Sequence, residues 1–321
     1  MDTLSRLKLV VSGAIKEEVE LASYTSFRIG GKAKYFYIAS NTDEIISLVD
    51  ICKKIELPFL VLGGGSNILI SDDGFDGLVI KIGDNNIEIG GKKMACSGGV
   101  LLSLAVQKAM ASNLSGLEWA IGIPGTIGGA VHNNAGAYGG DMAGIVDEIE
   151  IIKKGKIKKI KNKKCEFSYR NSVFRNENNN DIVLSTTINL ILGDKKEIKS
   201  KMDEIISRRR KKMDSYPSAG SVFKNITLNK NEMSEFILQH PELPGDYMKT
   251  NNIPSAWLVE QCELKGKKIG GAMVSEKHAG RIINTGSAKA ENVIILVSII
   301  KQKVRSKFNI QLMEEIEYIG F

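Results

Sequence analysis

The residues best suited to chemistry in this sequence form a glycine-rich stretch from 122 to 140. Glycine has no Cβ, so a dense run of it lets a ligand come close to the main chain. The free N–H groups of such a segment can also converge on an anion. Ile127, Val131 and Tyr138 interrupt the glycines, which argues against a flexible linker. The stretch therefore predicts a binding loop for a phosphate-bearing cofactor.

A second glycine cluster, residues 63–67 (GGGSN), lies between two short apolar runs at 59–62 and 68–70. This pattern predicts a strand, a loop and another strand. A dinucleotide site of the Rossmann type needs a glycine motif that opens a helix within a βαβ unit. Here only Ser71 follows the second run before the turn-forming residues 72–77, so no helix of useful length fits. The spacing excludes a Rossmann fold.

The elements that must position these loops are predicted from hydrophobic spacing and from capping residues. Helices are expected at 1–20, 42–55, 101–110, 195–212 and 288–304. Strands are expected at 34–39, 59–62, 68–70, 78–82, 87–89, repeatedly between 145 and 187, at 188–192 and at 311–319. The polar segment 227–254, which contains three prolines, is predicted to be a surface insertion.

The charge of the chain is concentrated in one segment. The formal net charge is +7, and residues 153–164 alone carry eight lysines; subtracting these eight charges leaves −1. Isoleucines alternate on both sides of Lys154 and Gly155, which predicts an exposed hairpin. Sites for nucleic acids usually place aromatic residues among the basic ones, and this segment has none. We therefore expect no nucleic-acid partner.

The four cysteines are scattered and have no nearby histidine: Cys52, Cys96, Cys165 and Cys262. Their spacing excludes a zinc ribbon and a disulfide framework, and predicts no metal site. The apolar residues 7–15 are broken by Lys8 and Ser12, so they resemble a helix face rather than a signal peptide. The uncharged apolar run 293–300 is too short to span a bilayer. We expect a cytoplasmic protein without a membrane partner.

Seven motifs, in order along nearly the whole chain, resemble the UDP-N-acetylenolpyruvoylglucosamine reductase family (the MurB type). They are 25–31 (TSFRIGG), 63–67 (GGGSN), 122–130 (GIPGTIGGA), 134–139 (NAGAYG), 169–172 (YRNS), 218–225 (SAGSVFKN) and 270–280 (GGAMVSEKHAG). The short interval between Arg170 and Ser221 is similar to the second type of the family. Two departures are the long segment 227–254 and Arg281, which stands where phenylalanine is common.

The resemblance implies an α+β fold with three parts. A two-part FAD-binding domain of the vanillyl-alcohol-oxidase type precedes a C-terminal α+β substrate-binding domain. On this basis residues 1–83, joined by the C-terminal strand 309–321, are expected to form the first FAD-binding subdomain. Residues 84–205 are expected to form the second, and residues 206–308 the substrate-binding domain.

The resemblance also implies an activity, that of a UDP-N-acetylmuramate dehydrogenase in peptidoglycan synthesis, and thus in cell wall biogenesis, cell shape and cell division. NADPH, as co-substrate, would pass a hydride to N5 of FAD and from there to the vinyl carbon of UDP-N-acetylglucosamine enolpyruvate. The product is UDP-N-acetylmuramate. Residues 63–67 contain no histidine, so the FAD is expected to be non-covalent. A monomer acting on a small UDP-sugar enolpyruvyl ether is expected.

Three catalytic residues follow from the resemblance. Arg170 would grip the substrate carboxylate, because a guanidinium stays protonated and binds bidentately. Ser221 would donate a proton, which a hydroxyl can do only when neighbours position and assist it. Alignment on the final Ile-Gly pair assigns the third role to Glu315, although the usual preceding proline is missing. Glu317 is the alternative, because both carboxylates would share one face of a strand.

The remaining site residues are also carried over from the family. Those expected to contact FAD are Gly63, Gly64, Gly65, Ser66, Asn67, Gly122, Ile123, Pro124, Gly125, Thr126, Gly128, Gly129, Ala135 and Gly136. Those expected to contact the substrate are Tyr169, Arg209, Lys224, Asn225 and Lys268, with Lys265 as a further candidate. The basic run 208–212 lies where the family binds the UDP diphosphate, and Arg209 is the first candidate in it. A basic helix end also suits its own dipole, so the contact within 208–212 is not decided by sequence.

Other functions are compatible with part of these features. An FAD-dependent oxidase of the same fold would keep both glycine loops but has no need of Arg170, Ser221 and Glu315. A non-catalytic flavin or nucleotide binder would need only the loops. His132 lies inside the glycine-rich stretch, but the implied mechanism gives it no task, so a packing or hydrogen-bonding role is expected.

Overall fold

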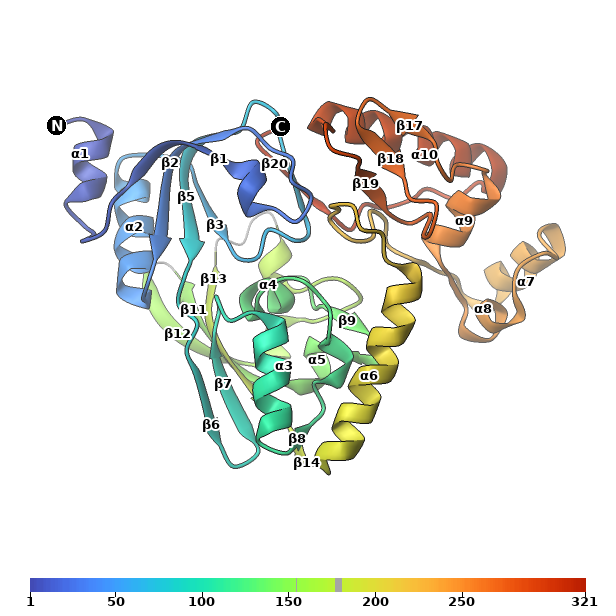
Figure 1. Ribbon diagram of the computed structural model, residues 1–321, viewed down its shortest axis with the longest axis horizontal. Helices are drawn as coiled ribbons and strands as arrows, with labels where there is room; N and C mark the ends of the chain where they lie inside the picture. Colours follow the sequence, from blue (N-terminus) through green and yellow to red (C-terminus); the bar gives the residue numbers. More distant parts are fainter. Residues whose placement is uncertain (154, 177–180) are drawn as a thin grey trace. The chain divides into compact units, whose positions relative to one another are not determined.

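The computed structural model describes residues 1–153, 155–176 and 181–321, and the chain forms two compact units (Figure 1). Unit 1 comprises residues 1–20, 32–65 and 74–211. Unit 2 comprises residues 21–31, 66–73 and 212–321. Two short N-terminal segments therefore belong with the C-terminal third of the chain. The three-part division at residues 83 and 205 stays a prediction.

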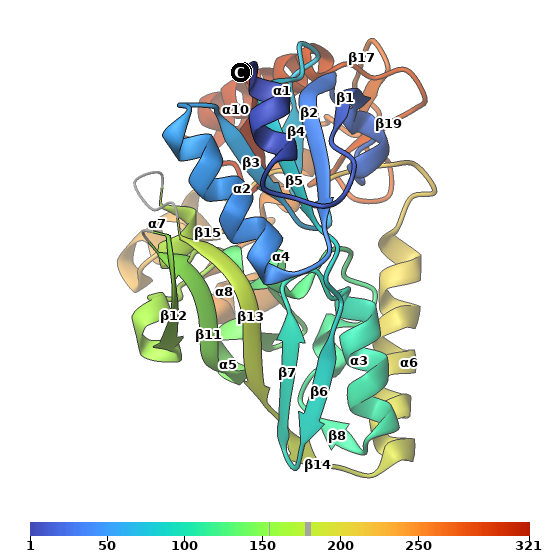
Figure 2. The same ribbon diagram turned by 90° about the vertical axis from the view of Figure 1, so that its left-hand side faces the viewer.

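One sheet of unit 1 has four strands in the order β1–β2–β5–β3. Its strands are β1 (Lys16–Glu20), β2 (Lys32–Ala39), β5 (Phe75–Ile82) and β3 (Phe59–Leu62). β2 and β3 run parallel to β5, and β1 runs antiparallel to β2. Helix α2 (Thr42–Lys54) is capped by the Asn41 side chain and packs its apolar face on this sheet (Figure 2).

The helix predicted at 1–20 is wrong. Helix α1 spans only Thr3–Lys8, and residues 16–20 form the edge strand β1. Four of the five residues in β1 are charged and exposed, with Val19 half-buried. Charged side chains are a common protection of edge strands, and they hide the strand pattern from a hydrophobicity count.

The second sheet of unit 1 has five strands in the order β12–β11–β13–β7–β6, with all neighbours antiparallel. They are β6 (Ile87–Gly90), β7 (Lys93–Ser97), β11 (Val146–Lys153), β12 (Lys156–Lys161) and β13 (Ile182–Asn189). Helices α3 (Leu102–Ala111) and α6 (Lys195–Lys212) contribute buried side chains to the core of this sheet. Both helices were expected from sequence.

Short elements complete unit 1. They are β8 (Leu114–Ser115), β14 (Ile191–Leu192), β9 (Gly136–Ala137), β10 (Gly140–Asp141), α4 (Ile127–His132), α5 (Met142–Ile145) and the 3-10 turns η2 (Glu118–Ala120), η3 (Asn162–Cys165) and η4 (Val173–Arg175). Helix α4 lies within the glycine-rich stretch, which was expected to be a loop throughout. Thr126 begins this helix, because its side chain accepts a hydrogen bond from the N–H of Gly129.

The predicted lysine hairpin is confirmed by the antiparallel pairing of β11 with β12. Its turn residue Lys154 lies outside the described residues. Lys159 approaches Glu148 and Glu150, and Lys161 approaches Asp147 and Glu148. Each exposed pair adds little stability. Together these ion pairs place carboxylates beside the lysines, so the hairpin is not a purely positive patch.

Unit 2 is built on a three-stranded antiparallel sheet and a long helix. The sheet has the order β17 (Lys268–Ile269), β18 (Ala272–Val274), β19 (Ile282–Asn284). Helix α10 (Ala290–Phe308) buries Val293, Leu296, Val297, Ile300 and Val304, the face that its spacing predicts. The Asp72 carboxylate accepts hydrogen bonds from the N–H groups of Ala290 and Glu291 and so caps this helix. Helix α9 (Ser255–Gln261) and the turn η1 (Leu21–Tyr24) also belong to unit 2.

Most residues of the segment 227–254 are exposed, as expected of a surface insertion, but the segment is folded and part of it is buried. It contains α7 (Lys230–Gln239) and α8 (Gly245–Thr250), and the short strands β15 (Ile226–Thr227) and β16 (Asn252–Ile253) pair at its ends. Met233, Phe236 and Leu243 are buried in the core of unit 2. The Phe236 ring stacks on Phe308 of α10 with centroids 6.1 Å apart. Its apolar residues form a single face, which the polar average of the segment conceals.

The C-terminal strand is shorter than predicted. Strand β20 (Glu317–Ile319) pairs in parallel with β4 (Ile68–Ile70) in unit 2. The preceding residues 311–316 are irregular except for an antiparallel bridge between Phe223 and Glu314. The strand shortens because the chain changes partners here, from the segment around Phe223 to β4.

Candidate functional site

The two predicted glycine loops meet in unit 1. A Cβ added to Gly64 would lie 2.5 Å from Cα of Gly125, and one added to Gly63 would lie 2.6 Å from Oγ1 of Thr126. Real Cβ atoms essentially never make contacts below 3.0 Å. The main chains therefore touch at Gly64 and Gly125, and the Thr126 side chain fills the space beside Gly63. Gly65, Gly122 and Gly125 also have positive φ angles of 59°, 74° and 118°, which favour glycine.

Several N–H groups of the glycine-rich stretch bond within the protein. The N–H groups of Ile127 and Gly128 donate to the carbonyls of Val100 and Gly98, and that of Ala130 donates to Thr126. Because Gly129 donates to the Thr126 side chain, four successive N–H groups are used by the fold. The expectation that this stretch offers free N–H groups is thus corrected for 127–130. What the loops offer is bare main chain at 63–65 and 122–125.

A lysine that the sequence did not point to supports the first loop. The Lys81 ammonium on β5 donates a hydrogen bond of 2.5 Å to the carbonyl of Gly63. Burial lowers the pKa of this ammonium. The only sequence signal was a lysine within the apolar run 78–82. Its contact fixes Gly63 and adds a cation beside the loop.

The motif at 169–172 is pinned to the second half of the glycine-rich stretch. The Arg170 guanidinium donates through Nη2 to the carbonyl of Gly136 at 2.7 Å. The Ser172 hydroxyl donates to the carbonyl of His132 at 2.6 Å, and the Asn134 amide donates to the carbonyl of Ser168 at 2.9 Å. Three bonds from three side chains thus hold Arg170 beside Ala135 and Gly136.

The backbone and side chain of Arg170 are both constrained. Its φ angle is 51°, in the left-handed region that L-residues adopt at a cost of about 1–3 kcal/mol. Its guanidinium carbon lies 5.3 Å from the centre of the Tyr169 ring. Arg175 donates through Nη1 to the Arg170 carbonyl at 3.0 Å and holds the strained peptide. An arginine fixed in this way can bind an anion with little further loss of freedom.

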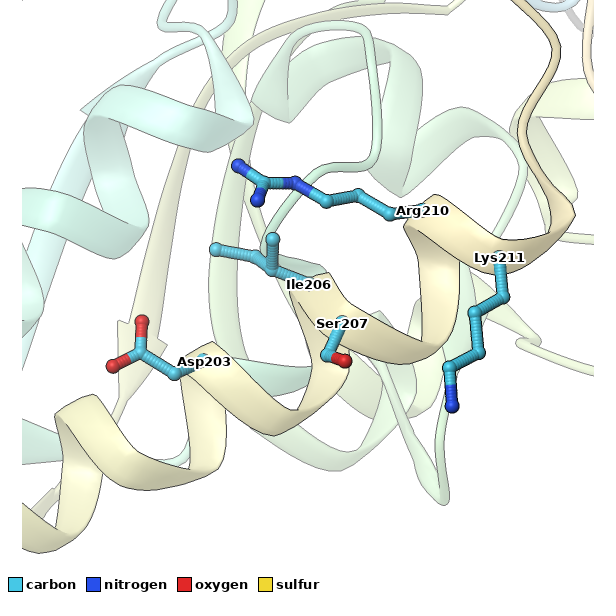
Figure 3. Close-up of a pocket in the computed structure, with 5 residues that line it drawn as sticks. All are labelled: Asp203, Ile206, Ser207, Arg210 and Lys211. Atoms are coloured by element: carbon cyan, nitrogen blue, oxygen red, sulfur yellow. The ribbon is translucent and has the colours of Figure 1, made fainter.

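Within the basic end of α6, Arg209 lies against the glycine-rich stretch. Its Cδ is 3.1 Å from the position of a Cβ on Gly122, and its guanidinium carbon is 5.1 Å from the Tyr138 ring centre. Arg208 instead pairs with Glu204 along the helix. Arg210 and Lys211 line a pocket of about 520 Å³. Their side chains leave helix α6 in different directions (Figure 3). The other residues that line the pocket are Asp203, Ile206 and Ser207.

In unit 2, Ser221 and Glu315 belong to one short ladder. The Glu315 N–H donates to the Val222 carbonyl at 2.7 Å, and the Lys224 N–H donates to the Met313 carbonyl at 2.9 Å. On the other side of the same segment, the Val222 N–H donates to Gly280 at 2.9 Å. The segment 221–224 thus runs between two neighbours, and the backbone of Glu315, the predicted carboxylate, bonds to the residue that follows the predicted proton donor.

The carboxylates near the C-terminus differ in their surroundings. Glu314 pairs with Lys301 at 2.8 Å, and Glu317 is the first residue of β20. Glu315 precedes this strand, so the expected sharing of a strand face with Glu317 is wrong. The Asn67 amide donates to the Glu315 carbonyl at 3.1 Å, which fixes Glu315 beside the last residue of the first glycine cluster.

The predicted substrate residues of unit 2 lie at different places in it. The Asn225 side chain accepts a hydrogen bond from the Ser255 N–H at 3.2 Å, at the first residue of α9. The backbone of Lys224 belongs to the ladder described above, and its side chain is half-buried. Lys268 is exposed on β17, whereas Lys265 pairs with Glu260. Of these residues, Lys224 and Asn225 follow Ser221 closely along the chain.

His278 and its neighbours form a polar cluster in unit 2 that sequence reasoning did not single out. The buried Ser275 hydroxyl donates to the Asp214 carboxylate and accepts the N–H groups of Lys277 and His278. Burial lowers the pKa of His278, and the charges of Arg281 and Lys212 lower it further. Asp214 acts in the opposite direction. The imidazole is therefore neutral at pH 7.

The lowered pKa of His278 predicts a pH dependence of stability. An unfolded histidine binds a proton near pH 6.5, whereas the folded imidazole resists it. The free energy of unfolding should therefore fall as the pH drops from about 7 through 6.5, until the folded group also protonates. We expect His278→Gln to lose less stability over this range, measured by urea unfolding at pH 7.5 and 5.5. Equal losses in both proteins would contradict this prediction.

The cysteines are inert in the structure. All four are free, and Cys262 is half-buried. Burial raises the pKa of Cys52 and Cys96 to about 12 and that of Cys165 to about 11. In the part of the chain that the structure describes, no cluster of His, Cys, Asp and Glu could hold a metal ion. In the same residues, no helix is long and apolar enough to cross a membrane.

Comparisons with known proteins agree with this geometry. A family model described as an FAD binding domain matches residues 33–160, which include both glycine loops. A model described as the C-terminal domain of UDP-N-acetylenolpyruvoylglucosamine reductase matches residues 211–319. The fold and the loops thus define an FAD-binding oxidoreductase with an α+β fold and a separate C-terminal domain, as predicted.

The match extends over the whole chain. The reductase of Clostridium novyi is 37% identical over 309 residues, which cover 95% of this chain and 92% of that protein. The reductase of Caldanaerobacter subterraneus is 37% identical over 98% of this chain and 96% of its own length. The crystal structure of the enzyme from Thermus caldophilus aligns with a TM-score of 0.76 at 30% identity, covering 96% of this chain and all of that one. The chain belongs to the UDP-N-acetylenolpyruvoylglucosamine reductase family.

Proposed function

We propose that this protein uses NADPH to reduce UDP-N-acetylglucosamine enolpyruvate to UDP-N-acetylmuramate, as a cytoplasmic monomer. The observation that carries the proposal is the ladder at 221–224, in which the Glu315 N–H bonds to Val222, the residue next to Ser221. An FAD-dependent oxidase would have no use for this arrangement. Membership of the family supports the same substrate.

The glycine loops fit FAD. The close packing of Gly64 on Gly125 brings the two loops together, so one pyrophosphate could contact the main chain of both. We assign the cofactor to residues 63–67, 122–126, 128–129 and 135–136, held without a covalent bond. When bound, FAD would supply the hydride that passes from NADPH to the substrate. Lys81 keeps the first loop in place by its bond to Gly63.

Arg170 is assigned to the substrate carboxylate. Its guanidinium stays charged, and its bonds to Gly136 and its position over Tyr169 fix its direction before the substrate arrives. Hydride addition to the vinyl carbon pushes negative charge towards that carboxylate. A charged group already in place stabilises this charge without reorganising.

Ser221 is assigned the proton transfer to the neighbouring carbon, and Glu315 the stabilisation of the enolate-like intermediate with Arg170. A carboxyl group can stabilise negative charge only by donating a hydrogen bond, so this role requires the protonated form of Glu315. Tyr169, Lys224, Asn225 and Lys268 are assigned to the sugar nucleotide. Arg209 is assigned to the diphosphate, because it is the basic residue of α6 that lies against Gly122 and Tyr138.

The choice between Glu315 and Glu317 has a direct test. We expect Glu315→Ala to slow the oxidation of reduced flavin by the enolpyruvyl substrate about 100-fold, the usual cost of losing one stabilising group at a developing charge. Glu317→Ala, two residues away, should stay within about 3-fold, a change under 1 kcal/mol. Rates come from stopped-flow absorbance of the flavin. A larger loss in the Glu317 variant would assign the role to that residue.

The function itself is tested by two half-reactions. The purified yellow protein should be bleached rapidly by NADPH in the absence of oxygen, and UDP-N-acetylglucosamine enolpyruvate should restore the colour. Formation of UDP-N-acetylmuramate is checked by mass spectrometry. A protein that NADPH does not bleach, or that is reduced only by an alcohol or an aldonolactone, would overturn the proposal in favour of an oxidase.

A further inference from the structure

Arg281 lies directly across from Ser221. The two residues form an antiparallel bridge. The hydrogen bond beside this bridge runs from the Val222 N–H to the Gly280 carbonyl, so Ser221 and Arg281 are a non-hydrogen-bonded pair. In such a pair the Cα atoms are about 4.5 Å apart, and both side chains leave the same face of the ladder. The first atoms of the Arg281 side chain therefore run beside the Ser221 hydroxyl.

The backbone of Arg281 is fixed on both sides. Its N–H donates to the His278 carbonyl, and its carbonyl accepts the N–H of Ser275, both at 2.9 Å. The His278 ring lies over Gly280, because a Cβ there would be 3.0 Å from Cε1 of the imidazole. A turn anchored in this way holds residue 281 in register with Ser221.

Two cations and one carboxylate act on the His278 imidazole of this turn. The positive charge of Arg281 reaches the His278 imidazole and helps to lower its pKa. Lys212 adds to this effect, and Asp214, whose carboxylate accepts a hydrogen bond from Ser275, opposes it. The imidazole therefore carries no charge at pH 7, and Arg281 is the cationic residue paired with Ser221 across the bridge.

A serine hydroxyl is a weak acid, and the step assigned to Ser221 leaves a negative charge on it. As the proton moves, the O–H bond breaks and its electron pair stays on oxygen, while the carbanion's pair forms the new C–H bond. The resulting alkoxide regains a proton from water. We propose that Arg281 is a positioning residue that stabilises this alkoxide, so that proton donation by Ser221 becomes faster. The inference rests on the proposed function and concerns only its second half-reaction.

The test compares substitutions of equal size at two arginines of unit 2. Arg281→Met keeps most of the side chain but removes its charge, and Arg281→Lys keeps the charge. Arg305→Met makes the same change at an exposed position in the last turn of α10. Each protein, loaded with FAD, is reduced by NADPH and then mixed with UDP-N-acetylglucosamine enolpyruvate in H₂O and in D₂O.

We expect Arg281→Met to slow oxidation of the reduced flavin about 10-fold to 30-fold, less than the loss of a group that contacts the reacting atoms. Its solvent isotope effect should rise, because proton transfer then limits the rate. Arg281→Lys should recover most of the rate, and Arg305→Met should behave as the unchanged protein. Reduction by NADPH should be the same in all of them.

Two results would overturn the inference. One is an Arg281→Met protein with an unchanged rate and isotope effect. The other is a slow variant that also binds FAD weakly or is reduced slowly by NADPH and is not rescued by lysine, since this marks a structural role. If the unchanged protein itself does not react with the enolpyruvyl substrate, the proposed function fails first, and the two failures are thereby separate.

Discussion

Replacing Ser221 by alanine is expected to abolish turnover while leaving a yellow protein that NADPH still bleaches. Proton transfer from a positioned side chain contributes roughly 10²-fold to 10⁴-fold to a rate. Ser221 is half-buried, and its neighbours on both sides of the ladder are backbone groups that fix its position. The adjacent Val222 and Phe223 are apolar and cannot replace the lost hydroxyl.

The measurement separates the two half-reactions of the Ser221→Ala protein. Stopped-flow absorbance should show reduction by NADPH at the normal rate, and oxidation by UDP-N-acetylglucosamine enolpyruvate should be at least about 100-fold slower. Ser234→Ala is the matched control, because that hydroxyl donates to the Lys230 carbonyl on the exposed helix α7. A Ser221→Ala protein that keeps more than a tenth of its turnover would show that another group donates the proton.

How much of the fold follows from sequence depends on the length of each apolar pattern. Helices α2 and α10 were predicted because their apolar residues recur at helical spacing over more than three turns. Strand β1 was missed because its residues are mostly charged, and the strand predicted at 311–316 was wrong because the course of this segment is set by a distant partner. Residues 311–316 follow the ladder at 221–224, which no periodicity within the C-terminus can reveal.

The site shows the same difference. The glycines at 63–65 and 122–125 were recognisable because a close approach to the main chain favours glycine. The sequence predicted a ligand as the neighbour, and at Gly64 and Gly125 the neighbour is another main chain. Lys81, Ser172 and His278 were missed, since each acts through a bond to a carbonyl or a charge far away in the sequence. The expected nest of free N–H groups was partly wrong, because local glycine content does not tell which N–H groups the helix α4 uses.

The contact between the glycine loops predicts that Gly64→Ala will lose FAD. Its new Cβ would lie 2.5 Å from Cα of Gly125, so the loops must separate by about 1 Å to reach an ordinary carbon contact. A phosphate held by both main chains would then lose about two charge-assisted hydrogen bonds, each worth roughly 1.5–3 kcal/mol. A loss of about 3 kcal/mol or more corresponds to a Kd raised by at least about 100-fold.

Fluorescence titration of the FAD-free protein with FAD gives this Kd, and circular dichroism shows whether the fold is intact. Overpacking should also lower the free energy of unfolding by about 1–3 kcal/mol. Gly90→Ala is the matched control, because a Cβ at Gly90 meets nothing within 4 Å and its φ angle is ordinary. If Gly64→Ala binds FAD as tightly as Gly90→Ala while remaining folded, the two loops do not share the pyrophosphate, and the cofactor lies on one of them alone.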